Sequence, residues 1–286
     1  MEIIIGKSAG FCYGVKRAVE GTYEEIKNNK DKETYCLGEI VHNKNVVSEL
    51  EEKGIKFIND IEDARGKTII RAHGVEKEIY DKANDIGIEL KDLTCPKVLH
   101  IHEMIDKYAK EGYFIFLCGK KEHPETIGNY SYCRENSYII EDKDDIENAI
   151  MEFEKRKMRK AVLISQTTYN KDKFELVNKR IQNVENIELI VKNTICMATK
   201  IRQDETKKIA SEVNAMIIIG GKNSSNTREL YNISKDRCEH TYIIQDEEEL
   251  ELNEIKDVEK IGIMAGASTP QYSINRVVER IRKSEN

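Results

Sequence analysis

The chain repeats one local order three times. In each copy an apolar strand leads into a loop that contains a cysteine, a helix follows, and a second strand then ends at a short polar motif. Cys12, Cys95 and Cys196 occupy the same place in this order. A later strand of each copy ends at a second polar motif. Such periodicity constrains the fold more than any single segment, because each copy must be a structural unit of similar design.

The spacing of the polar motifs supports the repeat. The first motif follows its cysteine by 30, 28 and 30 positions, at His42, His123 and Asn226. The second motif follows by 61, 72 and 72 positions, at His73, Thr167 and Ser268. The first copy is shorter because its middle segment is trimmed. We therefore predict three lobes, at residues 1–94, 95–194 and 195–286.

Strands that alternate with helices predict parallel sheets joined by helical crossovers, and ligands of such folds bind beyond the carboxyl ends of the strands. All nine motif loops follow predicted strands. The predicted fold class is therefore α/β, with three pseudo-threefold-related lobes of mainly parallel sheets around one central site.

Composition excludes several classes of function. The net charge of −6 argues against nucleic acid as the main ligand, since proteins that bind a nucleic-acid phosphate backbone usually show a basic excess or a basic stripe. Apolar runs such as "FIFLC" are far shorter than the roughly 20 residues that span a membrane. The first residues show no secretory pattern, so we expect a cytoplasmic protein in which disulfides are rare. The seven cysteines are then candidates for metal binding, catalysis or burial.

Three thiolates in equivalent loops could hold zinc or an iron–sulfur cluster. Closely spaced cysteine pairs, typical of structural zinc sites, are absent. A saturated [4Fe–4S] cluster takes four cysteines, so Cys12, Cys95 and Cys196 would leave one iron open to substrate. Each lies shortly before a predicted helix, whose N-terminus stabilises a thiolate. The remaining cysteines fit no shared position and are expected to be small buried apolar residues: Cys36, Cys118, Cys133 and Cys238.

The other motif residues are mostly neutral or cationic hydrogen-bond donors. Such donors at strand-to-helix turns suit a phosphate or diphosphate group, to which helix N-termini add N–H groups. The loop "GGKNSSNT" is not a Walker A sequence, so nucleotide hydrolysis is not expected. The predicted donor residues are His42, His73, His123, Thr167, Ser224, Ser225, Asn226 and Ser268.

Glu125, in the motif "HPE", is a carboxylate among these donors. Burial near an anionic ligand would raise its pKa, so that it could deliver a proton. Alternatively, its carboxylate caps the helix that follows.

In their order, the motifs "GFCYGVKRA", "VHN", "AHGV", "TCPKV", "HPE", "SQTT", "TICMATKIRQ", "KNSSNT" and "AGAST" resemble the LytB/IspH family of 4-hydroxy-3-methylbut-2-enyl diphosphate reductases. The resemblance covers essentially the full chain. It implies an iron–sulfur oxidoreductase that removes the allylic hydroxyl of its diphosphate substrate and forms isopentenyl and dimethylallyl diphosphates, in the last step of the non-mevalonate isoprenoid pathway.

The resemblance also implies roles for particular residues. Cys12, Cys95 and Cys196 would be the ligands of a [4Fe–4S] cluster with one open iron. Glu125 would be the proton donor, and Thr167 would contact the substrate hydroxyl. His123 would join them in catalysis and, with the other donor residues, bind the substrate. No flavin or nicotinamide motif is visible, so the expected electron donor is a ferredoxin or flavodoxin.

Two other classes of function remain open from the residues alone. One is a non-catalytic protein that uses the cluster to sense redox state or a phosphorylated metabolite. The other is a zinc-dependent hydrolase.

The motif "GKKEHPET" departs from the family pattern, which more often has small residues before the histidine. We expect this difference to alter only the shape of the loop.

Overall fold

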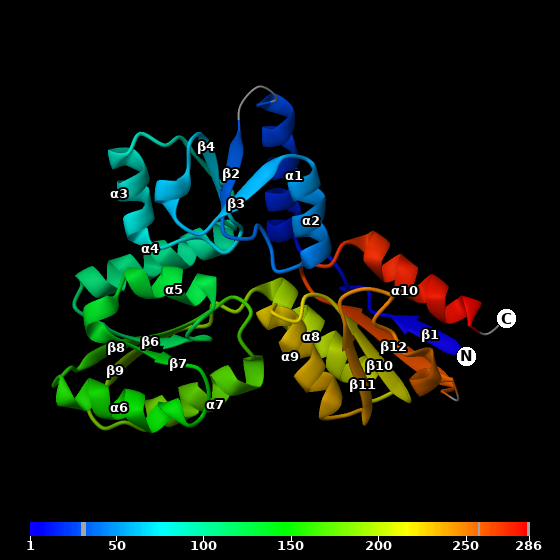
Figure 1. Cartoon of the computed structure of the whole chain (residues 1–286). Coiled ribbons are helices and arrows are strands. Elements are labelled where there is room, and N and C mark those ends of the chain that lie inside the picture. Colours follow the sequence, from blue (N-terminus) through cyan, green and yellow to red (C-terminus); the bar gives the residue numbers. More distant parts are fainter. Residues whose placement is uncertain (30–32, 257, 285–286) are drawn as a thin grey trace. The chain divides into compact units, whose positions relative to one another are not determined.

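The computed structural model describes residues 1–29, 33–256 and 258–284 (Figure 1). They form three four-stranded parallel sheets with helices between the strands, which confirms the predicted α/β class. The chain divides into two compact units. Unit 1 contains Met1–Lys16, Val41–Lys53 and Met197–Asn286, and unit 2 contains Arg17–Ile40 and Gly54–Cys196.

Unit 1 contains the sheet that we call the third sheet. Its strands, in spatial order, are β1 (Glu2–Ile5), β12 (Lys260–Ala265), β10 (Ala215–Ile219) and β11 (His240–Ile244). The helices of this unit are α2 (Lys44–Glu52), α8 (Met197–Ala210), α9 (Ser225–Lys235), η3 (Leu252–Ile255) and α10 (Gln271–Lys283).

Alternating side chains of β10 pack on opposite faces of the third sheet. Ile217 belongs to one buried cluster with Ile274 and Val277 of α10. Ile218 belongs to another with Ile209 of α8 and residues of α9. Because successive strand residues point to opposite faces, one buried strand supplies the apolar surface for helices on both sides.

Unit 2 contains the first and second sheets, each with its own strand order. The strands of the first sheet are β3 (Ile55–Ile58), β2 (Thr34–Leu37), β4 (Lys67–Ile70) and β5 (Leu90–Asp92). Those of the second sheet are β7 (Ser137–Ile140), β6 (Phe114–Cys118), β8 (Lys160–Ser165) and β9 (Glu188–Lys192).

Apart from α1, which precedes β2, the helices of unit 2 lie between these strands in the sequence. Helix α1 begins in unit 1 and continues into unit 2. The helices are α1 (Tyr13–Asn28), η1 (Ile61–Asp63), α3 (Lys77–Asp85), α4 (Pro96–Lys110), α5 (Pro124–Ser131), η2 (Arg134–Asn136), α6 (Asp145–Lys155) and α7 (Lys171–Gln182). In the described part of the chain, no helix is both long and apolar enough to cross a membrane.

The core of the second sheet is aromatic. Phe114 and Phe116 of β6 are fully buried, and both rings contact that of Phe153 on α6. Complete burial of such a side chain stabilises the fold by roughly 1.5–3 kcal/mol. This sheet is therefore a rigid base for the loops at the carboxyl ends of β6 and β8.

The first strand departs from the predicted lobes. We expected residues 2–5 in the first lobe, but β1 pairs with β12 in the third sheet, with Glu2 opposite Lys260. The reason is that β12 pairs with β10 on one side only, and the chain's first strand fills its other side. The three predicted ranges otherwise remain a prediction, and they include residues 30–32, 257 and 285–286, which lie outside the described residues.

The strand orders also change the interpretation of the repeat. In every sheet the edge strand that leads to a cysteine lies beside the strand that ends at a second motif. The loop of each cysteine and the loop of one second motif therefore follow adjacent strands of the same sheet. The pairs are Cys12 with Ser268, Cys95 with His73, and Cys196 with Thr167. The interval of about 30 residues after each cysteine thus connects one sheet to the next, and not two loops of one lobe.

Candidate active site

The three cysteine loops share a backbone contact. Each cysteine N–H donates to a carbonyl oxygen two positions beyond the neighbouring strand. The donor and acceptor pairs are Cys12 and Ala267 at 3.2 Å, Cys95 and Ala72 at 3.0 Å, and Cys196 and Thr167 at 3.0 Å. The threefold sequence register is therefore matched by an equivalent local structure.

Exposure separates these cysteines from the rest. Cys12, Cys95 and Cys196 are partly exposed, whereas the other four are buried as predicted. Burial raises the pKa of the Cys36 thiol to about 12, so that thiol is inert near neutrality. Helices begin directly after the three exposed cysteines, at Tyr13, Pro96 and Met197. Three accessible soft ligands at helix N-termini fit an anionic iron–sulfur cluster.

Glu125 and Thr167 form a buried pair in unit 2. The backbone N–H of Thr167 donates to Glu125 Oε1 at 2.6 Å, and the Thr167 hydroxyl donates to Oε2 at 2.7 Å. Only 2% of Glu125 is exposed, and this burial raises the pKa of its carboxyl to about 7 although the bonds from Thr167 lower it. The group can therefore hold a proton near neutral pH.

Glu125 lies in the first turn of α5, as the capping alternative requires, but its carboxylate binds Thr167 and is not the N-cap. The N-cap of α5 is His123, whose Nδ1 accepts the N–H of Glu125 at 3.1 Å. Because Nδ1 accepts, the neutral imidazole of His123 carries its proton on Nε2. His123 thus fixes the start of the helix and leaves the carboxylate of Glu125 to Thr167.

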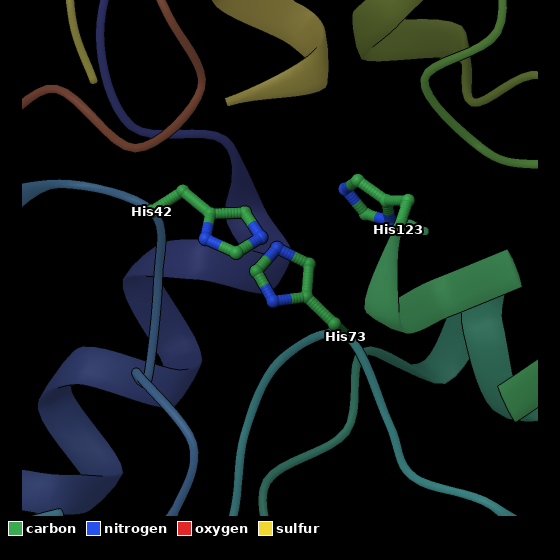
Figure 2. A group of neighbouring side chains, drawn as sticks. All are labelled: His42, His73 and His123. Atoms are coloured by element: carbon green, nitrogen blue, oxygen red, sulfur yellow. The ribbon is translucent and has the colours of Figure 1, made fainter. Parts of the chain in front are cut away.

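His73 lies beside His123 within unit 2. Their ring centroids are 5.3 Å apart and the rings are nearly perpendicular. Figure 2 shows both rings, drawn together with that of His42, which belongs to unit 1. Within unit 2, the predicted residues His73, His123, Glu125 and Thr167 all follow the carboxyl ends of strands.

Gln166 is a buried residue of this region that the motif spacing did not single out. Its Oε1 accepts the N–H of Lys120 at 3.2 Å and the hydroxyl of Thr126 at 3.3 Å. It thereby links the loop of Thr167 to the loop of His123. Its place in the motif "SQTT" was a signal, but nothing in the sequence showed its partners.

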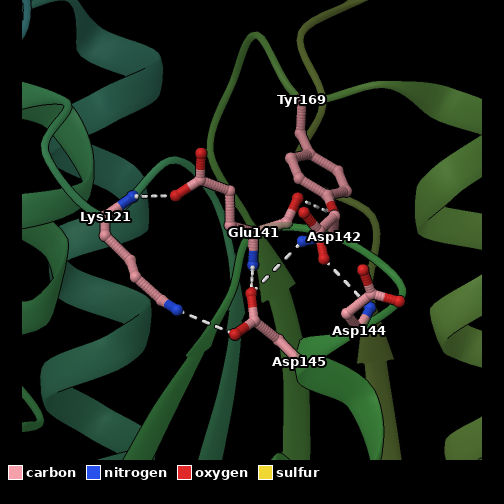
Figure 3. A network of polar contacts seen from close by, with 6 residues as sticks. All are labelled: Lys121, Glu141, Asp142, Asp144, Asp145 and Tyr169. Carbon is pink, nitrogen blue, oxygen red and sulfur yellow. Dashed lines mark hydrogen bonds and ion pairs between the residues drawn. The ribbon is translucent and has the colours of Figure 1, made fainter.

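A polar network supports the same loops from the outside (Figure 3). Lys121 binds Glu141 through its backbone N–H at 3.1 Å and Asp145 through Nζ at 2.7 Å. The hydroxyl of Tyr169 donates to the carbonyl oxygen of Glu141 at 3.0 Å. Residues 141–145 therefore hold both the segment before His123 and the segment after Thr167.

In unit 1 the predicted donors gather at the start of α9. Ser224 is its N-cap and accepts the N–H of Thr227 at 3.3 Å. Ser225 and Asn226 follow in the first turn and are buried. Both polar side-chain atoms of Asn226 are buried without a hydrogen-bond partner in the described residues, which is costly unless a ligand or water binds them. A helix N-terminus with such a side chain suits an anion.

His42 approaches this loop through its backbone. The Ser268 hydroxyl donates to the carbonyl oxygen of His42 at 3.2 Å. A Cβ atom at Gly221 would lie 2.2 Å from the same oxygen, so only glycine fits there. His42, Ser268 and the loop before α9 are thus held together in unit 1.

The predicted site residues therefore fall into two sets, one in each unit. Unit 1 holds Cys12, His42, Ser224, Ser225, Asn226 and Ser268, and unit 2 holds His73, Cys95, His123, Glu125, Thr167 and Cys196. One central cavity that joins the two sets stays a prediction.

Comparison with known proteins gives one consistent result. Residues 3–282 match the family model described as LytB protein. The chain is 41% identical to the 4-hydroxy-3-methylbut-2-enyl diphosphate reductase of Caldanaerobacter subterraneus subsp. tengcongensis, over 99% of this chain and 97% of the relative. It is 42% identical to the enzyme of that name from Clostridioides difficile, over 97% and 98%.

Solved structures agree with these relatives. The chain is similar to a structure of (E)-4-hydroxy-3-methyl-but-2-enyl diphosphate reductase, described as the terminal enzyme of the non-mevalonate pathway, with a TM-score of 0.68, 40% identity and coverage of 99% and 100%. It is also similar to the E-1-hydroxy-2-methyl-but-2-enyl-4-diphosphate reductase from Plasmodium falciparum, with a TM-score of 0.88, 31% identity and coverage of 97% and 87%.

Proposed function

Because the chain belongs to the LytB protein family, we propose that it acts as a 4-hydroxy-3-methylbut-2-enyl diphosphate reductase, the activity for which its relatives are named. The membership confirms the resemblance of the sequence motifs. The reaction consumes two electrons and two protons, removes the allylic hydroxyl as water, and yields isopentenyl and dimethylallyl diphosphates.

The proposed cofactor is a [4Fe–4S] cluster with Cys12, Cys95 and Cys196 as ligands. Support comes from their partial exposure, their places before helices and their equivalent backbone contacts. When bound, the cluster supplies electrons and an open iron for the substrate hydroxyl. A ferredoxin or flavodoxin would deliver the electrons, and a cytoplasmic location is part of the same proposal.

The observation that carries the proposal is the buried Glu125–Thr167 pair. A carboxyl with a pKa of about 7 is protonated in part of the molecules at neutral pH and can deliver the proton that the departing hydroxyl needs. Thr167 orients this carboxyl through two hydrogen bonds. His123 fixes the backbone at Glu125 by accepting its N–H at Nδ1.

The donors of unit 1 would bind the diphosphate. Ser224, Ser225 and Asn226 lie at the positive end of α9. The amide of Asn226, which has no hydrogen-bond partner among the described residues, offers both a donor and an acceptor. Ser268 and His42 lie beside the same loop. This region has the donors that an anion needs, whereas the acid lies in unit 2.

One anaerobic preparation tests the proposal. We expect about four irons and four sulfides per chain after reconstitution, and formation of both diphosphate products from the hydroxylated substrate with a strong one-electron donor. Cys95→Ser should lose most of the iron and the turnover. A full cluster without product would instead indicate the sensing function, and zinc without sulfide would indicate a hydrolase.

A further inference from the structure

Helix α8 binds the loop that leads to Cys12. The helix begins at Met197, directly after Cys196. Further along it, Arg202 donates from Nε to the carbonyl oxygen of Ser8 and from Nη2 to that of Gly10, both at 2.9 Å. Arg202 is 3% exposed, so these bonds lie in the interior of unit 1. Buried guanidinium groups need such partners to offset the loss of hydration.

Glu205, three residues later on α8, binds the same loop from its donor side. Its carboxylate accepts the N–H groups of Lys7 and Ser8, each at 2.8 Å, and the Ser8 hydroxyl. Arg202 and Glu205 together thus bind both carbonyl oxygens and N–H groups of residues 7–10. Charged partners make these bonds stronger than ordinary backbone bonds.

The geometry of the loop leaves it little freedom. Gly10 has a φ of 98°, which L side chains rarely adopt. A Cβ at Gly6 would lie 2.0 Å from the Met264 sulfur, so the backbone there lies directly against β12. The N–H of Cys12 then binds Ala267. Hydrogen bonds to the backbone at Gly10 and at Cys12 therefore fix the position of the Cys12 thiol.

A second arginine makes a related contact in unit 2. Arg17 lies on α1, the helix after Cys12, and its Nη1 donates to the carbonyl oxygen of Thr94 at 3.0 Å. Thr94 directly precedes Cys95. In both units, therefore, an arginine on the helix that follows one cysteine binds the backbone just before another.

We propose that Arg202 and Glu205 are positioning residues that hold the Cys12 loop on α8 and thereby place this ligand for the iron–sulfur cluster. The inference rests on the proposed cluster. A ligand must be held to within about 0.5 Å to bind its metal well, and loops reach this only when side chains fix them. Neither residue needs to touch the cluster to have this effect.

The experiment compares anaerobic holoproteins of the wild type, Arg202→Met, Arg202→Lys and Glu205→Gln. Lys208→Met, at an exposed position of the same helix, is the matched control. Loss of the cluster to an iron chelator is followed by absorbance, and hydrogen exchange is measured for residues 6–12. Mutation of a residue that supports a metal ligand, without itself binding the metal, typically changes metal affinity by about 10- to 100-fold.

We expect Arg202→Met to lose iron about 10- to 100-fold faster than the wild type and the control, with faster exchange confined to the Cys12 loop. Arg202→Lys should recover part of the loss, because it keeps one donor, and Glu205→Gln should be intermediate. Unchanged exchange of residues 6–12 in both Arg202→Met and Glu205→Gln would overturn the inference. So would wild-type iron retention in both.

Failure of the proposed function gives a different result. A wild type that carries no iron and sulfide contradicts the cluster itself, whatever the variants do. If Arg202→Met does not fold, Arg202→Lys and Glu205→Gln still decide the question, because both keep side chains of similar size. A general loss of stability would speed exchange throughout unit 1, and this would also count against a positioning role.

Discussion

Two carboxylates of the molecule make nearly the same contacts and have opposite pKa shifts. Glu125 accepts the N–H and the hydroxyl of Thr167 in unit 2, and Glu205 accepts the N–H and the hydroxyl of Ser8 in unit 1. The pKa of Glu125 is raised to about 7, whereas that of Glu205 is lowered.

Burial explains the difference. Burial raises both pKa values and is the largest single influence on each. In Glu125, which is 2% exposed, it exceeds the effect of the two bonds from Thr167. In the half-buried Glu205, the bonds from Ser8 and the N–H and charge of Lys7 together outweigh it. With similar hydrogen bonds, the more deeply buried carboxyl of Glu125 can therefore hold a proton, whereas the carboxyl of Glu205 remains charged.

The largest effect that tests this contrast should come from Glu125→Gln. The amide cannot deliver a proton, so turnover should fall by about 10²–10⁴-fold, which is the usual contribution of a general acid. Cluster content and substrate binding should stay near those of the wild type. Turnover and iron are measured on the same anaerobic sample.

Glu122→Gln is the matched control, because Glu122 lies exposed in the same loop. Wild-type turnover in Glu125→Gln would remove this residue from the chemistry. The counterpart Glu205→Gln should instead show normal turnover per bound cluster, which distinguishes a proton donor from a positioning residue.

Thr167→Val should have a smaller effect. The variant keeps the backbone N–H but loses the hydroxyl that donates to Glu125, so the pKa of Glu125 should rise further. Because one of the two hydrogen bonds that orient the Glu125 carboxyl is lost, turnover at neutral pH should fall about tenfold. Because the pKa rises, the upper limb of the pH–rate profile should move to higher pH. Thr167→Ser should restore both, and a profile unchanged in Thr167→Val would contradict the pairing.

The two carboxylates should also give stability opposite pH dependences. The contribution of Glu125 is fully present below its ordinary pKa of 4.5 and is lost as the pH rises through about 7. That of Glu205 is present above 4.5 and is lost as the pH falls through its lowered pKa.

Urea unfolding of cluster-free protein between about pH 4 and about pH 8 measures both contributions. Relative to Glu125→Gln, the wild type should lose stability as the pH rises across this range. Relative to Glu205→Gln it should gain stability, chiefly at the acidic end. If both differences in stability changed with pH in the same direction, the pKa shifts of Glu125 and Glu205 would not be opposite, and burial would not explain their difference.

The smallest effect concerns the network outside the Glu125 loops. Tyr169→Phe removes the bond to the carbonyl oxygen of Glu141 and should lower the free energy of unfolding by about 0.5–1.5 kcal/mol. Turnover should change little, because Glu125 and Thr167 keep their mutual bonds. The control is Tyr130→Phe, which removes an exposed 3.4 Å hydrogen bond to the carbonyl oxygen of Arg134 and should lower the free energy of unfolding by less. Equal decreases in the two variants would mean that the network does not contribute to stability.

The sequence predicted the features that repeat along the chain. The register of the three cysteines and the alternation of strands with helices led to parallel sheets, to helices shortly after Cys12, Cys95 and Cys196, and to burial of the remaining thiols. These features depend on local patterns, so a single sequence displays them.

What the sequence could not show depends on distant partners. Glu125 and Thr167 are 42 positions apart, and Arg202 and Ser8 are 194 apart. An acidic or basic residue in a helix does not indicate which loop it binds. For the same reason β1 was assigned to the wrong sheet, because an apolar strand fits beside any parallel neighbour with a free edge.

The pairing of β1 with β12 has a consequence for synthesis on the ribosome. All strands of the first and second sheets come from continuous stretches, so these sheets can form as the chain emerges. The third sheet instead joins β1 to β12, about 255 positions later in the chain, and Cys12 gains its bond to Ala267 only when residues near 267 have emerged. Cys12 is thus synthesised before Cys95 and Cys196 but its loop is fixed after theirs, and the proposed cluster could gain all three ligands only after residue 267 has emerged.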